Sequence, residues 1–198
     1  ARGNGHTKVL CQIDNVEPHE HHLTDKLFNR YYLHSVDGFV YMSEQVRSEL
    51  KTYTDAPALF SPHPLFENFG ERVARSEACV RLGLDPANRY VLFFGLIRDY
   101  KGLDLLLEAW ARLKRAGQTE GRRLIVAGEF YTVREPYLKQ IADNGLQDEV
   151  LLHDRFIPDD EVKYYFSAAD FVVQPYKTAT QSGVTQIAYQ FCVPMVVT

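Results

Sequence analysis

The chain has 198 residues, of which 45% are apolar and 24% are charged, so it can bury a full hydrophobic core. Its net charge of −4 and its pI near 6.0 argue against a protein that binds nucleic acid or a membrane surface through overall charge. An anionic ligand would therefore have to be met by local cations. The sequence contains no apolar run of about 18 residues, so we expect no segment that spans a bilayer.

Short apolar runs alternate with longer amphipathic segments along the whole chain. Runs that are nearly continuous in apolar residues are typical of strands buried on both faces of a parallel sheet. The predicted strands are 8–13, 38–42, 90–95, 123–128, 150–153, 171–175 and 194–198. The predicted helices are 24–35, 44–52, 72–82, 102–116, 134–144, 159–168 and 183–191. Right-handed crossovers between successive strands then predict an α/β fold with a doubly wound parallel sheet.

Residues 54–70 interrupt this alternation with three prolines and no helical period, which predicts a linker that contains a short strand. We place a domain boundary there, between residues 1–65 and residues 66–198. Residues 1–53 hold only two predicted strands and two predicted helices, too little for an independent core. The last predicted strand has nothing after it. We therefore expect a piece of a longer protein, with the tail of one domain and most of a second.

The cysteines indicate a reducing compartment. Cys11, Cys79 and Cys192 are odd in number, far apart and set among apolar residues, with no C-x-x-C pair. This pattern predicts buried thiols rather than disulfides, and a cytoplasmic location.

Two cations follow the predicted strand 90–95, on the turn that leads into a helix. Ligands of parallel α/β sheets collect at the carboxyl ends of the strands, where a helix N-terminus attracts anions. Arg98 can grip a phosphate with two hydrogen bonds, and Lys101 adds a compact charge. Gly95 and Gly102 leave room for a close approach. The turn therefore predicts a binding site for a diphosphate.

A structural alternative stays open for these cations. Arg98 and Lys101 could simply pair with Asp99 and Asp104 on a solvated face. The turn also has neither the GxxxxGK[ST] motif of a P-loop nor the GxGxxG motif of a dinucleotide fold.

The stretch from Gly95 to Asp104 resembles the G-x-x-x-x-x-K-G-x-D motif of family-four retaining glycosyltransferases, which belong to glycosyltransferase group 1. These enzymes have the GT-B fold, in which two Rossmann-like domains face each other. The similarity continues over nearly the whole chain. Segments 14–20, 36–50 and 60–70 resemble the end of the acceptor-binding domain and the crossover. Segments 123–130, 150–176 and 181–198 resemble the donor-binding domain in its usual order.

The resemblance implies a transferase that moves a sugar from a nucleotide-diphosphate sugar to a saccharide or lipid-linked acceptor, with retention, as in polysaccharide biosynthesis. It implies that Arg98 and Lys101 hold the pyrophosphate, without a metal or another cofactor. A lipid-linked acceptor leaves open whether the protein is attached to the periphery of the membrane at its inner face. Nucleic acid is not among the expected partners.

Other site residues follow from the same resemblance. The nucleobase would rest near the backbone of Phe156 and Ile157, whereas the pattern favours a place in the core for their side chains. Relatives carry a histidine near the position of Asp14 that contacts the sugar at the reacting centre. Asp14 is not that histidine, and it is named as the catalytic candidate of its loop only because it lies near that position.

Gln181, Ser182 and Gly183 precede a predicted helix, and small polar residues there leave N–H groups available to a sugar or phosphate. A helix cap at Ser182 would explain two of these residues and leave Gln181 without a role. Most family members carry two glutamates across this segment, and this chain has Ala179 and Ile187 at those positions.

The second glutamate usually grips the ribose, which Ile187 cannot do. Either the loop 181–183 is used differently, or nucleotide binding is weakened. The second hypothesis is therefore a non-catalytic nucleotide-binding module or an inactive fragment. We expect the chain alone to be inactive, and to self-associate through exposed apolar surface.

Two further functions are disfavoured. His19, Glu20, His21 and His22 lack a metal-ligand spacing such as HExxH, so we expect no metal site. A pyridoxal-dependent phosphorylase would need a lysine in a setting suited to a Schiff base, and we find none.

Overall fold

The computed structural model describes residues 5, 7–16, 25–179 and 181–198. The histidine-rich segment 19–22 lies outside the described residues. The contacts divide the chain into two compact units, Ala1–Pro64 with Thr178–Gly183, and Leu65–Lys177 with Val184–Thr198. That residues 1–65 belong to an acceptor-binding domain stays a prediction.

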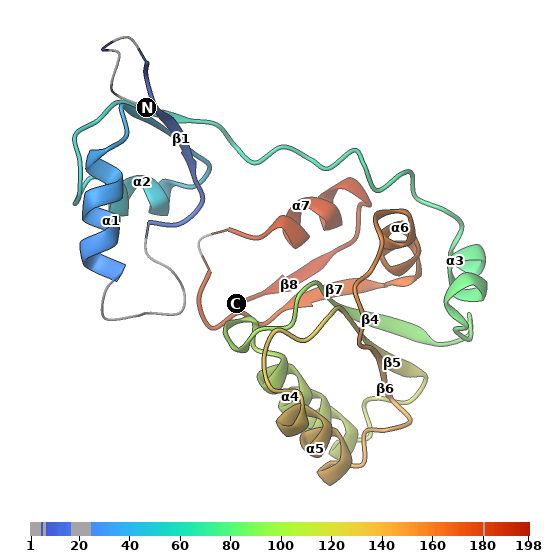
Figure 1. The fold of residues 1–198 in the computed structure, drawn as a ribbon. Coiled ribbons are helices and arrows are strands. Elements are labelled where there is room, and N and C mark those ends of the chain that lie inside the picture. Colours follow the sequence, from blue (N-terminus) through green and yellow to red (C-terminus); the bar gives the residue numbers. More distant parts are fainter. Residues whose placement is uncertain (1–4, 6, 17–24, 180) are drawn as a thin grey trace. The chain divides into compact units, whose positions relative to one another are not determined.

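The first unit is a small parallel sheet with two helices. Its elements are β1 (Leu10–Ile13), α1 (Asp25–His34), β2 (Gly38–Tyr41), α2 (Glu44–Leu50) and β3 (Ala58–Phe60), and the strand order is β1-β2-β3 (Figure 1). The strand expected inside the proline-rich segment is β3, which pairs with β2. Ser43 caps α2, because its Oγ accepts the N–H of Val46 at 3.3 Å.

The second unit is built on a five-stranded parallel sheet. Its strands are β4 (Arg89–Phe94), β5 (Arg122–Ala127), β6 (Val150–His153), β7 (Phe171–Gln174) and β8 (Met195–Val197). Its helices are α3 (Arg75–Leu82), α4 (Leu103–Arg115), α5 (Glu135–Asp143), α6 (Asp159–Ala168) and α7 (Gly183–Gln190), with a short 3₁₀ helix η2 (Asp99–Lys101) before α4. The 3₁₀ helix was not predicted.

Alternate residues of β4 point to opposite faces of this sheet. Tyr90 and Leu92 belong to the core under α3, α6 and α7, whereas Val91 and Phe93 belong to the core under α4 and α5. Figure 1 shows α4 and α5 on one side of the strands and α6 and α7 on the other. These two helix layers confirm the predicted α/β class with a doubly wound parallel sheet.

The strand order β6-β5-β4-β7-β8 reverses direction between β4 and β7. From β4 the chain moves outward through β5 to β6, and α6 then carries it back to the other side of β4. The segments that follow β4 and β7 therefore diverge at one edge of the sheet. Such a topological switch point is where doubly wound sheets bind their ligands.

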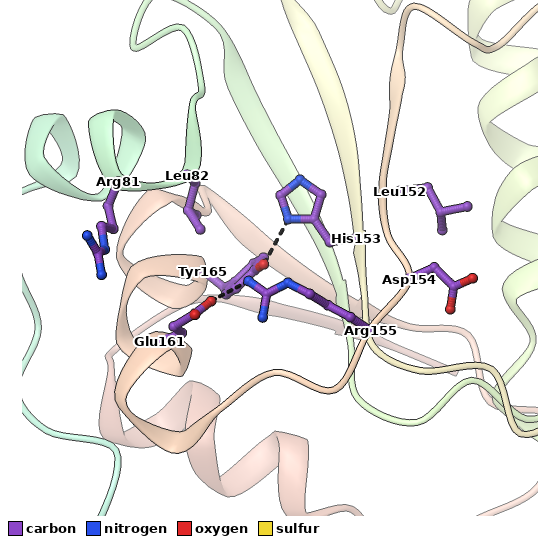
Figure 2. Close-up of a pocket in the computed structure, with 8 residues that line it drawn as sticks. All are labelled: Arg81, Leu82, Leu152, His153, Asp154, Arg155, Glu161 and Tyr165. Carbon is purple, nitrogen blue, oxygen red and sulfur yellow. Dashed lines mark hydrogen bonds and ion pairs between the residues drawn. The ribbon is translucent and has the colours of Figure 1, made fainter.

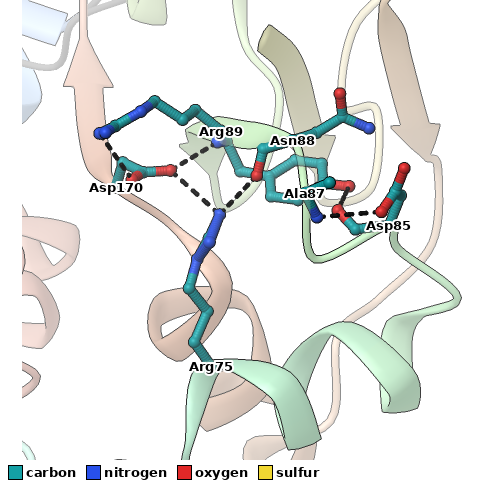
Figure 3. Close-up of polar contacts among 7 residues, drawn as sticks. Arg75, Asp85, Ala87, Asn88, Arg89 and Asp170 are labelled. Atoms are coloured by element: carbon teal, nitrogen blue, oxygen red, sulfur yellow. Dashed lines mark hydrogen bonds and ion pairs between the residues drawn. The ribbon is translucent and has the colours of Figure 1, made fainter. Parts of the chain in front are cut away.

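A cluster of polar side chains joins the strands at the opposite edge of the sheet, where β4 and β7 begin (Figure 3). Asp170, just before β7, accepts the backbone N–H of Tyr90 at 2.7 Å and a guanidinium N–H of Arg75 at 3.2 Å. Arg75 also donates to the carbonyl of Asn88 at 2.7 Å, and Arg89 lies 3.5 Å from the same carboxylate. The start of β4 is thereby tied to the start of β7 and to α3.

The prediction of buried thiols is wrong for one cysteine. Cys79 is buried and Cys11 is partly buried, but Cys192 is exposed. Cys192 lies on the turn after α7, where its φ is +50°, between the buried residues Phe191 and Val193. Among the described residues, no helix is both long enough and apolar enough to cross a membrane.

Candidate functional site

The turn after β4 carries both predicted cations, and both lie before helix α4 rather than inside it. Arg98 is in an extended conformation and precedes η2, of which Lys101 is the last residue. Gly102 then adopts a left-handed conformation, with φ of +70°, and α4 begins at the next residue. The turn therefore presents its cations at the carboxyl edge of the sheet, beside the topological switch point.

Gly102 allows this turn to pack against the end of β7. A Cβ on Gly102 would lie 1.9 Å from the carbonyl oxygen of Pro175, so no other residue fits without movement. The backbone N–H of Lys177 donates to the carbonyl of Tyr100 at 2.7 Å, and the Lys177 ammonium pairs with Asp104 at 2.7 Å. The close approach at Gly102 is thus to the protein's own backbone, which joins the two segments that flank the switch point.

Gly95 provides room for Lys101. Its φ is +97°, and a Cβ there would lie 3.2 Å from the Lys101 Nζ. A Cβ on Gly128, after β5, would lie 2.1 Å from the carbonyl oxygen of Gly95. Sequence reasoning missed Gly128, although its position after a strand repeats that of Gly95. Two glycines therefore let the backbones after β4 and β5 meet beside the lysine.

Lys101 is partly buried, and its ammonium faces an aromatic ring. Its Nζ lies 5.9 Å from the centroid of Tyr176. Within the described part of the chain it forms no ion pair with a carboxylate. Burial, helped by the nearby charge of Arg98, lowers the pKa of Lys101 to about 8. A buried cation of this kind gains from an anionic ligand.

The two acids of the structural alternative are engaged elsewhere. Asp99 Oδ1 accepts hydrogen bonds from Thr132 Oγ1 at 2.8 Å and from Tyr137 OH at 2.9 Å, and these bonds lower the pKa of Asp99. Asp104 pairs with Lys177. Neither acid neutralises Lys101, so that alternative does not hold for the lysine.

Arg98 is partly buried, and its guanidinium carbon lies 5.3 Å from the ring centroid of Tyr131. Tyr131 comes from the loop after β5, which stays paired with the β4 turn beyond the strand ends. The N–H of Ile97 donates to the carbonyl of Glu129 at 2.8 Å, and the N–H of Tyr131 donates to the carbonyl of Ile97 at 2.9 Å. Sequence reasoning missed Tyr131, because nothing in the local pattern pairs it with Arg98.

The loop after β6 separates its two predicted residues. The side chain of Ile157 is 7% exposed and belongs to the core under α6, as the core alternative states. Phe156 is 65% exposed and is therefore not a core residue. An ion pair of 2.8 Å between Arg134 and Asp154 ties this loop to the one after β5.

A pocket of about 490 Å³ lies beside the same loop, between α3, the end of β6 and α6 (Figure 2). His153 Nδ1 lies 2.8 Å from the hydroxyl of Tyr165, and burial lowers the pKa of His153. Arg155 pairs with Glu161. The lining residues are Arg81, Leu82, Leu152, His153, Asp154, Arg155, Glu161 and Tyr165. The Arg155 charge is compensated inside the pocket, unlike that of Lys101.

Gln181, Ser182 and Gly183 lead into α7, which begins at Gly183. The Oε1 atom of Gln181 is buried, and no described residue donates a hydrogen bond to it. Ile187 is buried in the core of the second unit, whereas Ala179 is exposed. The departure from the usual glutamate at 187 is thus also a packing feature, because the isoleucine side chain completes the core.

Asp14 belongs to the first unit and is exposed just after β1. Its placement at the carboxyl end of a parallel strand agrees with the type of edge at which these sheets bind ligands. Across the ranges that the structure describes, no three histidine, cysteine or acidic side chains come together as a metal site.

Residues 88–198 match the family model "Glycosyl transferases group 1". Curated relatives include D-inositol 3-phosphate glycosyltransferases. The one from Pseudarthrobacter chlorophenolicus is 30% identical over 117 residues, covering 59% of this chain and 28% of the relative. The one from Thermobifida fusca is 35% identical over 125 residues, covering 60% of this chain and 28% of the relative. This chain therefore covers less than a third of the length of either relative.

Solved structures extend the likeness to nearly the whole chain. Sucrose-phosphate synthase from Thermosynechococcus elongatus aligns with a TM-score of 0.80 at 18% identity, over 95% of this chain and 49% of that one. HepE from Anabaena, in complex with UDP and glucose, aligns with a TM-score of 0.77 at 17% identity, over 96% and 52%. At this identity they bear on the fold alone, and they agree with the predicted GT-B class. From the family match, the chain belongs to the glycosyl transferases group 1 family.

Proposed function

We propose that the chain is the nucleotide-sugar-binding part of a retaining, metal-independent glycosyltransferase. Residues 66–198 form its donor-binding domain, and residues 1–65 form the end of its acceptor-binding domain with the crossover. The donor is a nucleotide-diphosphate sugar, and the acceptor is a saccharide or a lipid-linked saccharide. The complex of the structurally similar HepE with UDP and glucose supports this class of donor.

One observation carries the proposal, which is the state of Lys101. Its ammonium is partly buried beside Arg98 at the switch-point edge, and no described carboxylate pairs with it. Burying a cation without a counter-charge costs stability unless a ligand supplies the missing charge. A diphosphate meets both cations at once, because a guanidinium binds two oxygens and an ammonium binds a third.

The same cations would act in the chemical step. When the glycosyl bond breaks, negative charge grows on the leaving nucleoside diphosphate. Arg98 and Lys101 are fixed donors in a site partly shielded from water, where stabilising such charge is worth about 3 to 4 kcal/mol per donor. Two cations in this setting can replace a divalent metal, which supports the metal-independent form of the reaction.

Gly95 and Gly102 serve the donor site by shaping the turn, since Gly95 leaves room for Lys101 and Gly102 lets the turn pack on Pro175. The backbone at Phe156 and Ile157 contacts the nucleobase. Gln181, Ser182 and Gly183 hold the sugar or the distal phosphate. A sugar hydroxyl there would donate to the side-chain amide oxygen of Gln181, which has no described donor. Asp14 is the catalytic candidate of the acceptor-binding part.

A second function is favoured by one observation. Ile187 is buried in the core and leaves the ribose without the carboxylate that relatives use. A non-catalytic nucleotide-binding module would need the diphosphate cradle but not this contact. Both functions require nucleotide binding, and only the transferase requires turnover.

Titration calorimetry with UDP, GDP and ADP tests the shared requirement. At least one nucleotide should bind, and Arg98→Ala and Lys101→Ala should each weaken it about tenfold, as expected for a lost charged hydrogen bond. Arg112→Ala is the matched control, because this arginine lies on α4, is 70% exposed and pairs with Glu108. Unchanged binding in both site variants, or no binding of any nucleotide by the full-length protein, would contradict the proposal.

A transfer assay with the full-length protein then separates the two functions. Release of nucleoside diphosphate that depends on acceptor supports the transferase. Tight nucleotide binding without transfer to any saccharide or lipid-linked acceptor supports the module instead. Retention is read from the anomeric configuration of the product by NMR.

A further inference from the structure

We infer that Tyr131 is the positioning residue for Arg98, holding its guanidinium where the diphosphate of the donor binds. The inference rests on the proposed function and adds to it a residue of the loop after β5. We call residues 128–134 the β5 loop. Neither the motif around Arg98 nor the family match assigns a role to this tyrosine.

The contact itself has the geometry of a cation–π pair. The Arg98 guanidinium carbon lies 5.3 Å from the Tyr131 ring centroid, within the range of about 6 Å for such pairs. Tyr131 is 56% exposed, so core packing does not explain its position. The preceding residue, Phe130, packs instead on the core and lies 5.5 Å from the ring of Tyr137. The β5 loop therefore sends one aromatic ring inward and the next toward Arg98.

The backbone fixes where this ring stands. Ile97 and Phe130 form a parallel bridge beyond the ends of β4 and β5. The bridge is closed by hydrogen bonds from Ile97 N–H to Glu129 and from Tyr131 N–H to Ile97, at 2.8 and 2.9 Å. Arg98 directly follows one of the bridged residues, and Tyr131 directly follows the other. Their side-chain contact is thus a consequence of register and not of a chance rotamer.

The β5 loop also controls the acid next to Arg98. Thr132, which is in this loop, and Tyr137, which is in α5, both donate to Asp99 Oδ1. This carboxylate is therefore turned toward Thr132 and Tyr137 and is held there by two hydrogen bonds. Tyr131 and Thr132, which are adjacent, thus orient both the cation and the anion of the turn.

A ring under the guanidinium is compatible with phosphate binding. Arginine carries five N–H donors in a planar fork, and a cation–π contact uses the charge of the group rather than any one of these donors. Arg98 can keep this contact and still offer two donors to a diphosphate. Restricting the arginine before binding also reduces the conformational entropy that it loses when the donor arrives.

A double-mutant cycle tests the inference. The probe is whichever of UDP, GDP and ADP the wild-type protein binds most tightly, and the readout is its dissociation constant by calorimetry. Tyr131→Ala should weaken nucleotide binding about threefold, which is the value of an exposed cation–π contact. Tyr131→Phe should bind nucleotide like the wild type, because it keeps the ring. In the Arg98→Ala background, Tyr131→Ala should have no further effect.

Each other outcome has a defined meaning. Equal weakening by Tyr131→Ala in both backgrounds would show that the ring contacts the nucleotide itself, which overturns the inference. A lower Tm with unchanged binding would reduce Tyr131 to a loop-stabilising residue and also overturns it. Val133→Ala, in the same loop and 67% exposed, is the control that should change neither quantity.

If Arg98→Ala alone leaves binding intact, the proposed function fails. If it weakens binding and Tyr131→Ala does not, only the inference fails.

Discussion

The two ends of strand β4 use cations in opposite ways. At its amino end, Arg75 and Arg89 converge on Asp170, which also accepts the N–H of Tyr90. At its carboxyl end, Lys101 is partly buried near Arg98 and forms no ion pair with a described carboxylate. At the amino end the charges are neutralised by ion pairs within the fold. At the carboxyl end the charge of Lys101 has no such partner and is available to an anionic ligand.

This difference separates structure from function on one sheet. Charged side chains that form ion pairs with each other stabilise the fold and need no ligand, as at Asp170. A buried cation without an acid costs stability, and such costs are concentrated at functional sites. The contrast predicts that removing charge at the amino end should lower the free energy of unfolding without changing the affinity for a ligand. Removing charge at the carboxyl end should do the reverse.

The largest expected effect is at Gly102, which holds the carboxyl end of β4 against the end of β7. Gly102→Ala should lower the free energy of unfolding by about 3 kcal/mol, because the new Cβ would lie 1.9 Å from the Pro175 carbonyl oxygen. Gly117→Ala is the matched control. It has a similar φ of +68° but nothing within 4 Å, so it should cost only the left-handed strain of about 1 kcal/mol. Urea unfolding measures both, and equal losses would show that the contact with Pro175 carries no energy.

The next largest effect on the free energy of unfolding is expected from Asp170, at the amino end of β4. Asp170→Ala should cost about 2 kcal/mol, because it leaves the Tyr90 N–H without its acceptor and two arginines without their carboxylate. Asp143→Ala is the control, since its carboxylate is exposed on α5 and its ion pair among the described residues is with Lys139. The dissociation constant for nucleotide should be unchanged in Asp170→Ala wherever the variant remains folded. A weakened affinity there would break the division between the two ends.

The strands and helices of the second unit were predictable from sequence for a simple reason. A strand buried on both faces must be apolar at every position, and the run Tyr90–Phe94 meets this condition. The seven predicted strands are all present, and so are the seven predicted helices, with ends that differ by up to three residues. The proline-rich segment hid the register of β3 because its pairing with β2 is long-range.

The candidate site was only partly predictable. Arg98 and Lys101 could be located because the strand-to-helix turn is a local pattern. The packing of Gly102 on Pro175 and of Arg98 on Tyr131 could not be, because each joins segments that only the strand order brings together. The 3₁₀ turn was missed for a related reason, since the left-handed Gly102 ends it where the helical period suggested that α4 had begun.

The smallest effect is the most informative about the contrast between the two ends. Lys101→Met should raise the free energy of unfolding by about 1 kcal/mol at pH 7, because it removes a charge that burial disfavours. The same variant should weaken nucleotide binding. Lys114→Met is the control, because that ammonium pairs with Glu149 at 3.1 Å. Its removal should not raise stability and should leave nucleotide binding unchanged.

The pH dependence of this gain follows from the pKa of Lys101, which is lowered to about 8 in the folded protein. Below pH 8 the lysine is charged in both states, so the folded protein bears the whole cost of burying the charge. Between about 8 and the ordinary lysine pKa of about 10.4, the unfolded chain holds more protons, and the wild type gains stability as pH rises. The advantage of Lys101→Met should therefore shrink over this interval. A constant difference between the two unfolding curves from pH 7 to pH 10 would mean that the ammonium is not disfavoured by burial, and the carboxyl end of β4 would then be as self-sufficient as the amino end.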